Sequence, residues 1–102
     1  MLELRPNCEC CDRDLAPAAT DAMICTYECT FCAGCVESIL SNVCPNCGGG
    51  FTPRPIRPVI EHREGLSLSR QPASQERVLT KFNKEELKAF ADQIKSIRPE
   101  ER

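Results

Sequence analysis

Eight cysteines in closely spaced groups constrain this chain more than any other feature of its sequence. They follow the pattern Cys8-x2-Cys11-x13-Cys25-x3-Cys29-x2-Cys32-x2-Cys35-x8-Cys44-x2-Cys47, all in the first half of 102 residues. A C-x2-C step turns tightly enough to direct two sulfurs at one ion, and two such steps complete a closed tetrahedral site. The pattern therefore predicts two four-cysteine metal sites, and all-thiolate coordination favours zinc.

The small number of apolar side chains around these cysteines supports the same interpretation. A folding unit of about 50 residues buries too little apolar surface to offset its chain entropy without disulfides, a metal or a partner. Trp is absent, and the apolar residues of this part are Leu15, Met23, Ile24, Phe31, Val36, Ile39, Leu40, Val43 and Phe51. Metal–sulfur bonds are predicted to replace most of the hydrophobic core.

The N-terminal residues and the cysteine count bear on the cellular compartment. The first residues, M-L-E-L-R-P-N-C, lack the basic and apolar regions of a secretory signal. No segment approaches the roughly 20 apolar residues of a membrane-spanning helix. We therefore expect a cytoplasmic protein with no membrane association, where clustered cysteines serve metals rather than disulfides. The odd total of nine also prevents complete pairing within the chain.

Charge is unevenly distributed along the chain, although the net charge is only −2. Residues 1–47 carry seven acidic and two basic side chains, whereas residues 48–102 carry eleven basic and eight acidic ones. Two zinc ions, each held by four thiolates, would bring the front half to about −9. Such a surface repels phosphate backbones, so nucleic-acid binding is a secondary hypothesis that rests on the basic tail and on Arg54, Arg57 and Arg63.

Local patterns predict a small α+β domain over residues 1–52. Residues 22–27 have the β-branched and aromatic character of a short strand, with residues 30–31 as the returning partner of a hairpin. From Ala33 to about Ser41, apolar residues at i, i+3 and i+4 predict one short helix.

The rest of the chain predicts an arm, a linker and a helical tail. Four prolines between residues 53 and 72 favour a polyproline-like arm that continues into a flexible linker, together residues 53–81. In the tail, residues 82–102, Asn83 and Glu86 form a capping box. Apolar residues at helical spacing then predict an amphipathic helix from about Lys84 to Ile97. Its apolar face packs either on the zinc unit or on another chain.

The cysteine-rich part resembles a RING-type zinc domain. The resemblance rests on E-C-T-F-C-A-G-C-V-E-S-I-L and C-P-N-C within residues 8–47: an aromatic residue precedes the fifth ligand, a helix follows the sixth, and C-P-x-C closes the set. It implies a RING-like cross-brace in which one zinc is held by Cys8, Cys11, Cys32 and Cys35, and the other by Cys25, Cys29, Cys44 and Cys47. Spacing alone leaves a sequential arrangement open, with ligands 8/11/25/29 and 32/35/44/47.

The whole chain also resembles a family of small, uncharacterised, cysteine-rich bacterial proteins. The shared elements are N-C-E-C-C, E-C-T-F-C, C-P-N-C-G-G and R-P-I-R-P. This resemblance implies the scaffold and a bacterial origin rather than a reaction.

Three positions depart from the pattern of RING ubiquitin ligases. Cys29 stands where a histidine is common, Cys10 replaces an aliphatic residue that contacts a ubiquitin-conjugating enzyme, and Gly48 replaces a basic residue after the last ligand. We interpret Cys10 as a small filler, with a redox-sensitive or substitute ligand as the alternative. His62, the only histidine, lies in the linker and is predicted to be solvated.

These observations rank three hypotheses of function. The first is a non-catalytic zinc-binding module that binds a protein partner, because a closed four-thiolate site leaves no open position for chemistry. The second is a nucleic-acid-associated protein similar to zinc ribbons. The third is an enzyme, either with RING-type ubiquitin-ligase-like activity or with thiol redox or metal-storage activity. Asp12, Asp14 and Asp21 are predicted to be solvated rather than catalytic.

Overall fold

A three-stranded antiparallel sheet, two helices and two short helical turns make up the regular secondary structure of the protein. The computed structural model describes residues 1–102. The elements are β1 (Ala22–Ile24), β2 (Thr30–Cys32), α1 (Ala33–Cys35), η1 (Val36–Leu40), β3 (Thr52–Pro53), α2 (Lys84–Ile94) and η2 (Pro99–Glu101). This small α+β architecture confirms the predicted fold class.

The sheet has the order β2-β1-β3, with β1 in the centre. The predicted hairpin is present, and Met23 of β1 lies opposite Phe31 of β2. Met23 also lies opposite Pro53 of β3. Because proline cannot donate a ladder hydrogen bond, it is tolerated at such an edge. The beginning of the predicted arm thus lies on the domain, where its first residue, Pro53, belongs to a short edge strand.

The predicted short helix runs through α1 and continues as the single π-helical turn η1. Ser41 ends it with a left-handed backbone at φ 49°, and Asn42 follows at φ 59°. A left-handed residue at this position turns the chain out of the helix. Asn42 then accepts a hydrogen bond from the Phe51 N–H at 2.9 Å.

The buried core consists of cysteines and a few apolar side chains. Phe31 is completely buried, and its ring meets the ring of Phe51 edge-to-face at 5.4 Å. Six of the 13 residues in this cluster are cysteines. Since so many core positions carry thiols, the cysteines are both core residues and candidate metal ligands.

Helix α2 packs on the cysteine-rich unit against η1. Its capping box is present: Asn83 Oδ1 accepts from the Glu86 N–H at 2.8 Å, and Glu86 Oε1 accepts from the Asn83 N–H at 3.0 Å. Leu87 and Ala91 are buried against the core. The helix ends at Ile94 rather than near Ile97. Arg98 is extended because it precedes a proline, and this starts the separate turn η2.

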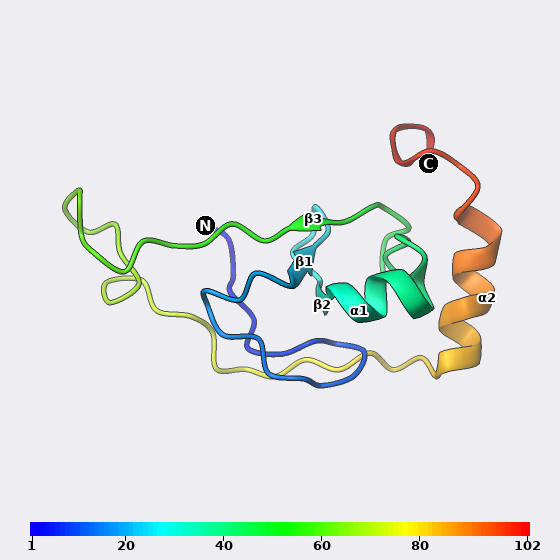
Figure 1. The fold of residues 1–102 in the computed structure, drawn as a ribbon, viewed down its shortest axis with the longest axis horizontal. Helices are drawn as coiled ribbons and strands as arrows, with labels where there is room; N and C mark the ends of the chain where they lie inside the picture. The colour runs from blue at the N-terminus through cyan, green and yellow to red at the C-terminus, as the bar shows by residue number, and fades with distance from the viewer.

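The segment predicted to be a flexible linker, residues 61–80, makes backbone hydrogen bonds to the N-terminal residues in the structure. The segment returns along the N-terminal residues, where it lies beside them in Figure 1. The N–H of Ser74 donates to the carbonyl of Leu4 at 3.0 Å, and the N–H of Thr80 donates to that of Glu9 at 2.7 Å. Hydrogen bonds to the N-terminal backbone therefore position a segment that has few apolar residues to bury.

Two arginines of the R-P-I-R-P motif fasten the arm to the front of the chain. Arg54 is only 4% exposed and donates to the carbonyls of Arg5 and Ala16, at 2.9 and 3.0 Å. Arg57 donates to the carbonyls of Leu2 and Gln71. Burial lowers the pKa of the Arg54 guanidinium. The guanidinium groups of Arg54 and Arg57 therefore bind carbonyl groups of the protein itself rather than an external anion.

None of the helices is long and apolar enough to cross a lipid bilayer. The molecule is elongated, with extents of 45 × 27 × 18 Å. The loop after the arm lies at one end and α2 at the other (Figure 1).

We expect Arg54→Ala to lower the free energy of unfolding by about 2 kcal/mol, because the buried Arg54 side chain and its hydrogen bonds to two carbonyls are lost. Urea unfolding followed by circular dichroism measures this. The matched control is Arg63→Ala, since Arg63 is exposed, and a change below about 0.5 kcal/mol is expected there. Equal effects of the two substitutions would contradict a structural role for Arg54.

Candidate metal centre

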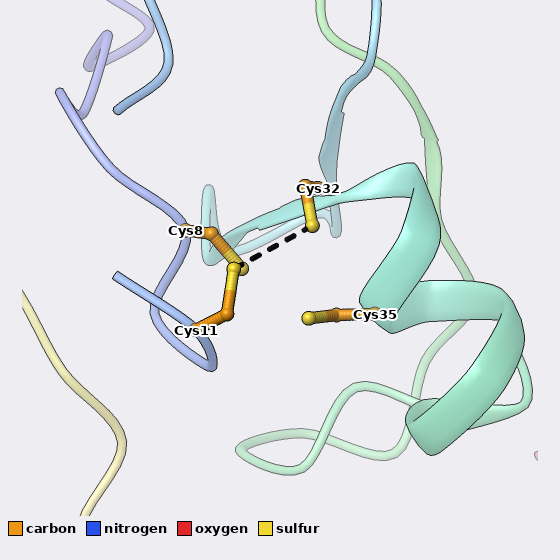
Figure 2. A group of neighbouring side chains, drawn as sticks. All are labelled: Cys8, Cys11, Cys32 and Cys35. Atoms are coloured by element: carbon orange, nitrogen blue, oxygen red, sulfur yellow. Dashed lines mark hydrogen bonds between the residues drawn. The ribbon is translucent and has the colours of Figure 1, made fainter. Parts of the chain in front are cut away.

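Four thiols from three parts of the chain converge in the first cysteine cluster. Cys8 and Cys11 lie on one tight turn, Cys32 ends β2 and Cys35 ends α1. All four Sγ atoms lie within 4.8 Å of one another. Figure 2 shows the side chains pointing toward a common centre, with the sulfurs of Cys11 and Cys32 3.8 Å apart. A tetrahedron with Zn–S bonds of about 2.3 Å has an edge of about 3.8 Å, so this spacing suits zinc.

The turn that carries Cys8 and Cys11 is fixed by its own backbone. The N–H of Cys8 donates to the carbonyl of Arg13 at 2.8 Å, and the N–H of Asp12 donates to the carbonyl of Cys8 at 2.9 Å. Asp12 takes a left-handed backbone at φ 63°, which closes the turn. The two sulfurs of the C-x2-C step therefore face the same side.

Two buried polar side chains, which the sequence analysis did not single out, attach this turn to its surroundings. Glu9 is 2% exposed, and its carboxylate accepts from the Thr30 N–H at 2.6 Å and from Arg5 at 2.7 Å. The amide of Asn7 donates to the carbonyls of Cys8 and Val78. Glu9 thus joins the turn to β2, which carries Cys32. The only sequence signal for either residue is its place in N-C-E-C-C.

The second cluster brings together Cys25, Cys44 and Cys47. Their sulfurs lie within 4.8 Å of one another. Cys25 follows β1, and the other two lie in the loop after η1. The N–H groups of Tyr27 and Gly49 donate to the sulfurs of Cys25 and Cys47, at 3.3 and 3.4 Å.

Cys29 lies beside this second cluster, but the structure does not bring it into the same close group. Its sulfur accepts a hydrogen bond from the side-chain amide of Asn46 at 3.4 Å. Its backbone carbonyl accepts from the N–H of Cys25 at 3.2 Å. Burial raises the pKa of Cys29, and the neighbouring Cys25 thiol adds to the rise. The fourth sulfur is therefore adjacent to the cluster and buried.

Burial makes the clustered thiols difficult to ionise in the absence of a cation. It raises the pKa of Cys8 to about 11 and also raises the pKa values of Cys35 and Cys44. For Cys11, burial acts in the same direction, but hydrogen bonds, first from the Arg13 backbone, lower the pKa. A divalent metal provides the positive charge that buried thiolates require. All nine cysteines are free thiols.

The grouping alternates along the sequence. The first cluster takes its pairs from residues 8–11 and 32–35, and the second takes its cysteines from residue 25 and residues 44–47. This grouping of thiols alternates along the chain as the interleaved arrangement would, with Cys32 and Cys35 beside Cys8 and Cys11. The two remaining candidates, Cys10 and His62, lie outside both groups. Cys10 is partly buried against the core, and His62 is exposed.

The fold and these two groups define a small α+β protein with paired cysteine clusters suited to zinc. The chain belongs to the family described as "Protein of unknown function (DUF1272)", which matches residues 1–57. It is also 61% identical, over 79 residues, to the uncharacterized protein R02474 of Rhizobium meliloti strain 1021; the match covers 78% of this chain and 87% of that protein. The predicted family of small, cysteine-rich bacterial proteins is thereby confirmed. No solved structure matches the chain.

Cys29 is expected to complete the second metal site once an ion is bound, because its buried sulfur accepts a hydrogen bond from Asn46, which lies between Cys44 and Cys47 in the chain. X-ray absorption at the zinc edge should show about four sulfurs around each ion in the unaltered protein. In Cys29→Ser, one of the two sites should exchange a sulfur for a lighter atom. Cys10→Ser is the matched control and should leave the sulfur count unchanged. An unchanged count in Cys29→Ser would exclude Cys29 as a ligand.

Proposed function

We propose that this protein is a non-catalytic, zinc-stabilised module that binds a protein partner. Two zinc ions per chain would be held in a RING-like cross-brace. One site would use Cys8, Cys11, Cys32 and Cys35, and the other Cys25, Cys29, Cys44 and Cys47. The observation that carries the proposal is the convergence of thiols from alternating parts of the chain into two separate groups.

The donor set favours zinc over other metals. Both groups offer only sulfur, which harder cations such as Mg²⁺ and Ca²⁺ bind poorly. A reducing cytoplasm, which we include in the proposal, keeps such thiols available. Four thiolates around one zinc ion would leave no position for water or substrate. A structural role for the metal follows from this chemistry.

Acid–base catalysis has little support among the aspartates of the front loop. Arg77 binds the carboxylates of Asp12 and Asp14 at 2.8 and 2.7 Å. Arg13 forms an ion pair with Asp21. These carboxylates are engaged with arginines at the surface and do not face a nucleophile across a cleft. The ion pairs of Asp12 and Asp14 with Arg77 hold the returning segment of the chain against the front loop.

Ubiquitin-ligase-like activity has less support than partner binding. In RING ligases, the residue between the first two ligands contacts the conjugating enzyme. Here that position is Cys10, and both Cys10 and Phe82 pack against the buried cluster. The tail that begins at Phe82 continues into α2, which covers η1. The surface available for such an enzyme is therefore already partly used by the chain itself.

Nucleic-acid binding also has less support. Of the arginines that suggested it, Arg54 and Arg57 donate to carbonyl groups of the protein itself. The front half carries a net −5 before any metal is bound. A binding assay over a salt series distinguishes this hypothesis, since phosphate contacts produce a steep loss of affinity with salt.

Purified protein is expected to contain about two zinc ions per chain by elemental analysis. Because each site is worth on the order of 10 kcal/mol, comparable to the stability of a whole small domain, exhaustive chelation should unfold residues 1–52. Circular dichroism and amide-proton dispersion in NMR spectra measure this. The variant Cys11→Ser should lose zinc and unfold, whereas Cys10→Ser should retain both. A fold that survives chelation would contradict the proposal.

A further inference from the structure

The chain after α2 turns back (Figure 1) and packs on the loop that carries the C-P-N-C segment. In this η2 segment, residues 95–102, the side chain of Arg102 donates to the carbonyl of Asn42 at 2.7 Å and to that of Gly48 at 3.4 Å. Asn42 precedes the C-P-N-C segment, and Gly48 follows it. One guanidinium group therefore joins the two ends of the loop that presents two thiols of the second cluster.

The η2 segment holds this guanidinium group from its own side. Arg102 Nε donates to the carbonyl of Ile97 at 2.9 Å, and the N–H of Ile97 donates to the carbonyl of Ile94 at 2.8 Å. The planar fork of an arginine can bind several carbonyls at fixed angles. Because one donor is fixed by the η2 segment, the other donors stay directed at the loop.

Two glycines of the loop let the returning chain approach closely. A Cβ atom at Gly50 would lie only 3.3 Å from Cγ of Pro99, which is tighter than ordinary contact. At Gly48, where φ is 80°, a Cβ atom would lie 3.5 Å from Cδ1 of Ile94. Since glycine has no side chain, the backbone of the loop and the apolar groups after α2 can touch directly.

The backbone at the start of the loop depends on contacts of this kind. Ser41 and Asn42 both have left-handed backbones, at φ 49° and 59°. Such a conformation is unfavourable for residues other than glycine and persists where neighbouring groups hold it. Arg102 binds the Asn42 carbonyl, and the Asn42 side chain accepts from the Phe51 N–H. Loss of the Arg102 contact would therefore loosen the chain that leads into Cys44.

The two clusters differ in the burial of the side chains that attach them. The turn of the first cluster is attached by Asn7 and Glu9, which are 0% and 2% exposed. Arg102, which attaches the loop of the second cluster, is only partly buried. Contacts within reach of solvent open more readily than contacts in the core. The second cluster thus depends on a contact that can open while the first cluster stays closed.

We propose that the η2 segment is a clamp on the second metal site. While Arg102 bridges Asn42 and Gly48, the loop keeps its two thiols aligned with Cys25; when the segment lifts, the second site loses its zinc and the first site stays loaded. Arg102 also lines the same cleft, of about 250 Å³, as the exposed Cys47. Its positive charge there favours a site that would carry a net −2 with zinc bound. The clamp presupposes the two zinc ions of the function proposed above.

Thiol labelling during metal removal tests the clamp in the full-length, zinc-loaded protein. The protein is placed in excess EDTA with iodoacetamide, and the labelled cysteines are located by peptide mass spectrometry over time. Cys11 and Cys47 are matched reporters, since each is the exposed cysteine of its cluster. Arg102→Ala should speed the labelling of Cys47 by at least about 10-fold, because its hydrogen bonds to both ends of the loop are lost. Labelling of Cys11 should change by less than about 2-fold.

Two further variants separate the contact from the charge. Arg98→Ala removes the same charge from the same segment, but Arg98 is exposed and pairs with Glu100 and Glu101 of its own turn. Both reporters should therefore keep the labelling rates of the unaltered protein. Arg102→Lys retains a positive charge and a donor for the Asn42 carbonyl, but not the fork. Its labelling rate at Cys47 should fall between those of the unaltered protein and Arg102→Ala.

The ratio between the two reporters decides the result. Unchanged labelling of Cys47 in Arg102→Ala, equal acceleration at Cys11 and Cys47, or an equal effect of Arg98→Ala would each overturn the clamp. In all three cases a chain that binds two zinc ions would leave the proposed function intact. A chain that binds no zinc at either site would contradict the proposed function together with the clamp.

Discussion

Buried thiols that face one another are the constraint on which the rest of this structure depends. Burial raises the pKa of Cys8, Cys35 and Cys44, so these groups resist ionisation until a cation approaches. The same cysteines make up much of the core. In the function proposed above, metal binding and core formation would involve the same atoms, so loss of a bound metal would unfold the chain rather than merely empty a site.

The interleaved grouping explains how so short a hairpin can be stable. A two-stranded hairpin is marginal in water, yet here Cys25 follows β1 and Cys32 ends β2, and each belongs to a different cluster. The hairpin is thus held at both ends by separate groups of sulfur atoms. Glu9 adds a third attachment through the Thr30 N–H.

Features with a local signature were predictable from the sequence. The capping box of Asn83 and Glu86 and the apolar spacing around Val36 identified both helices, and cysteine spacing identified the clusters. The contacts of Asn7 and Arg54 were not predictable, because their partners are carbonyls about 40 to 70 residues away. Composition also gave no sign of the backbone hydrogen bonds of residues 61–80, because a segment poor in apolar residues resembles a linker whether or not such bonds form.

The cysteines and the arginines that secure the arm lie in one part of the chain, and the exposed apolar side chains after the arm lie in the next. The family match ends at residue 57, so it contains every cysteine together with Arg54 and Arg57, which secure the arm. Exposed apolar side chains, among them Val59 and Ile60, begin just beyond it. The hydrogen bond from the Leu68 N–H to the Pro58 carbonyl closes this segment but leaves both side chains in solvent, so they add nothing to the core. The stabilising contacts of the chain are therefore concentrated in the part that holds the cysteines, and the segment that follows depends on polar contacts with it.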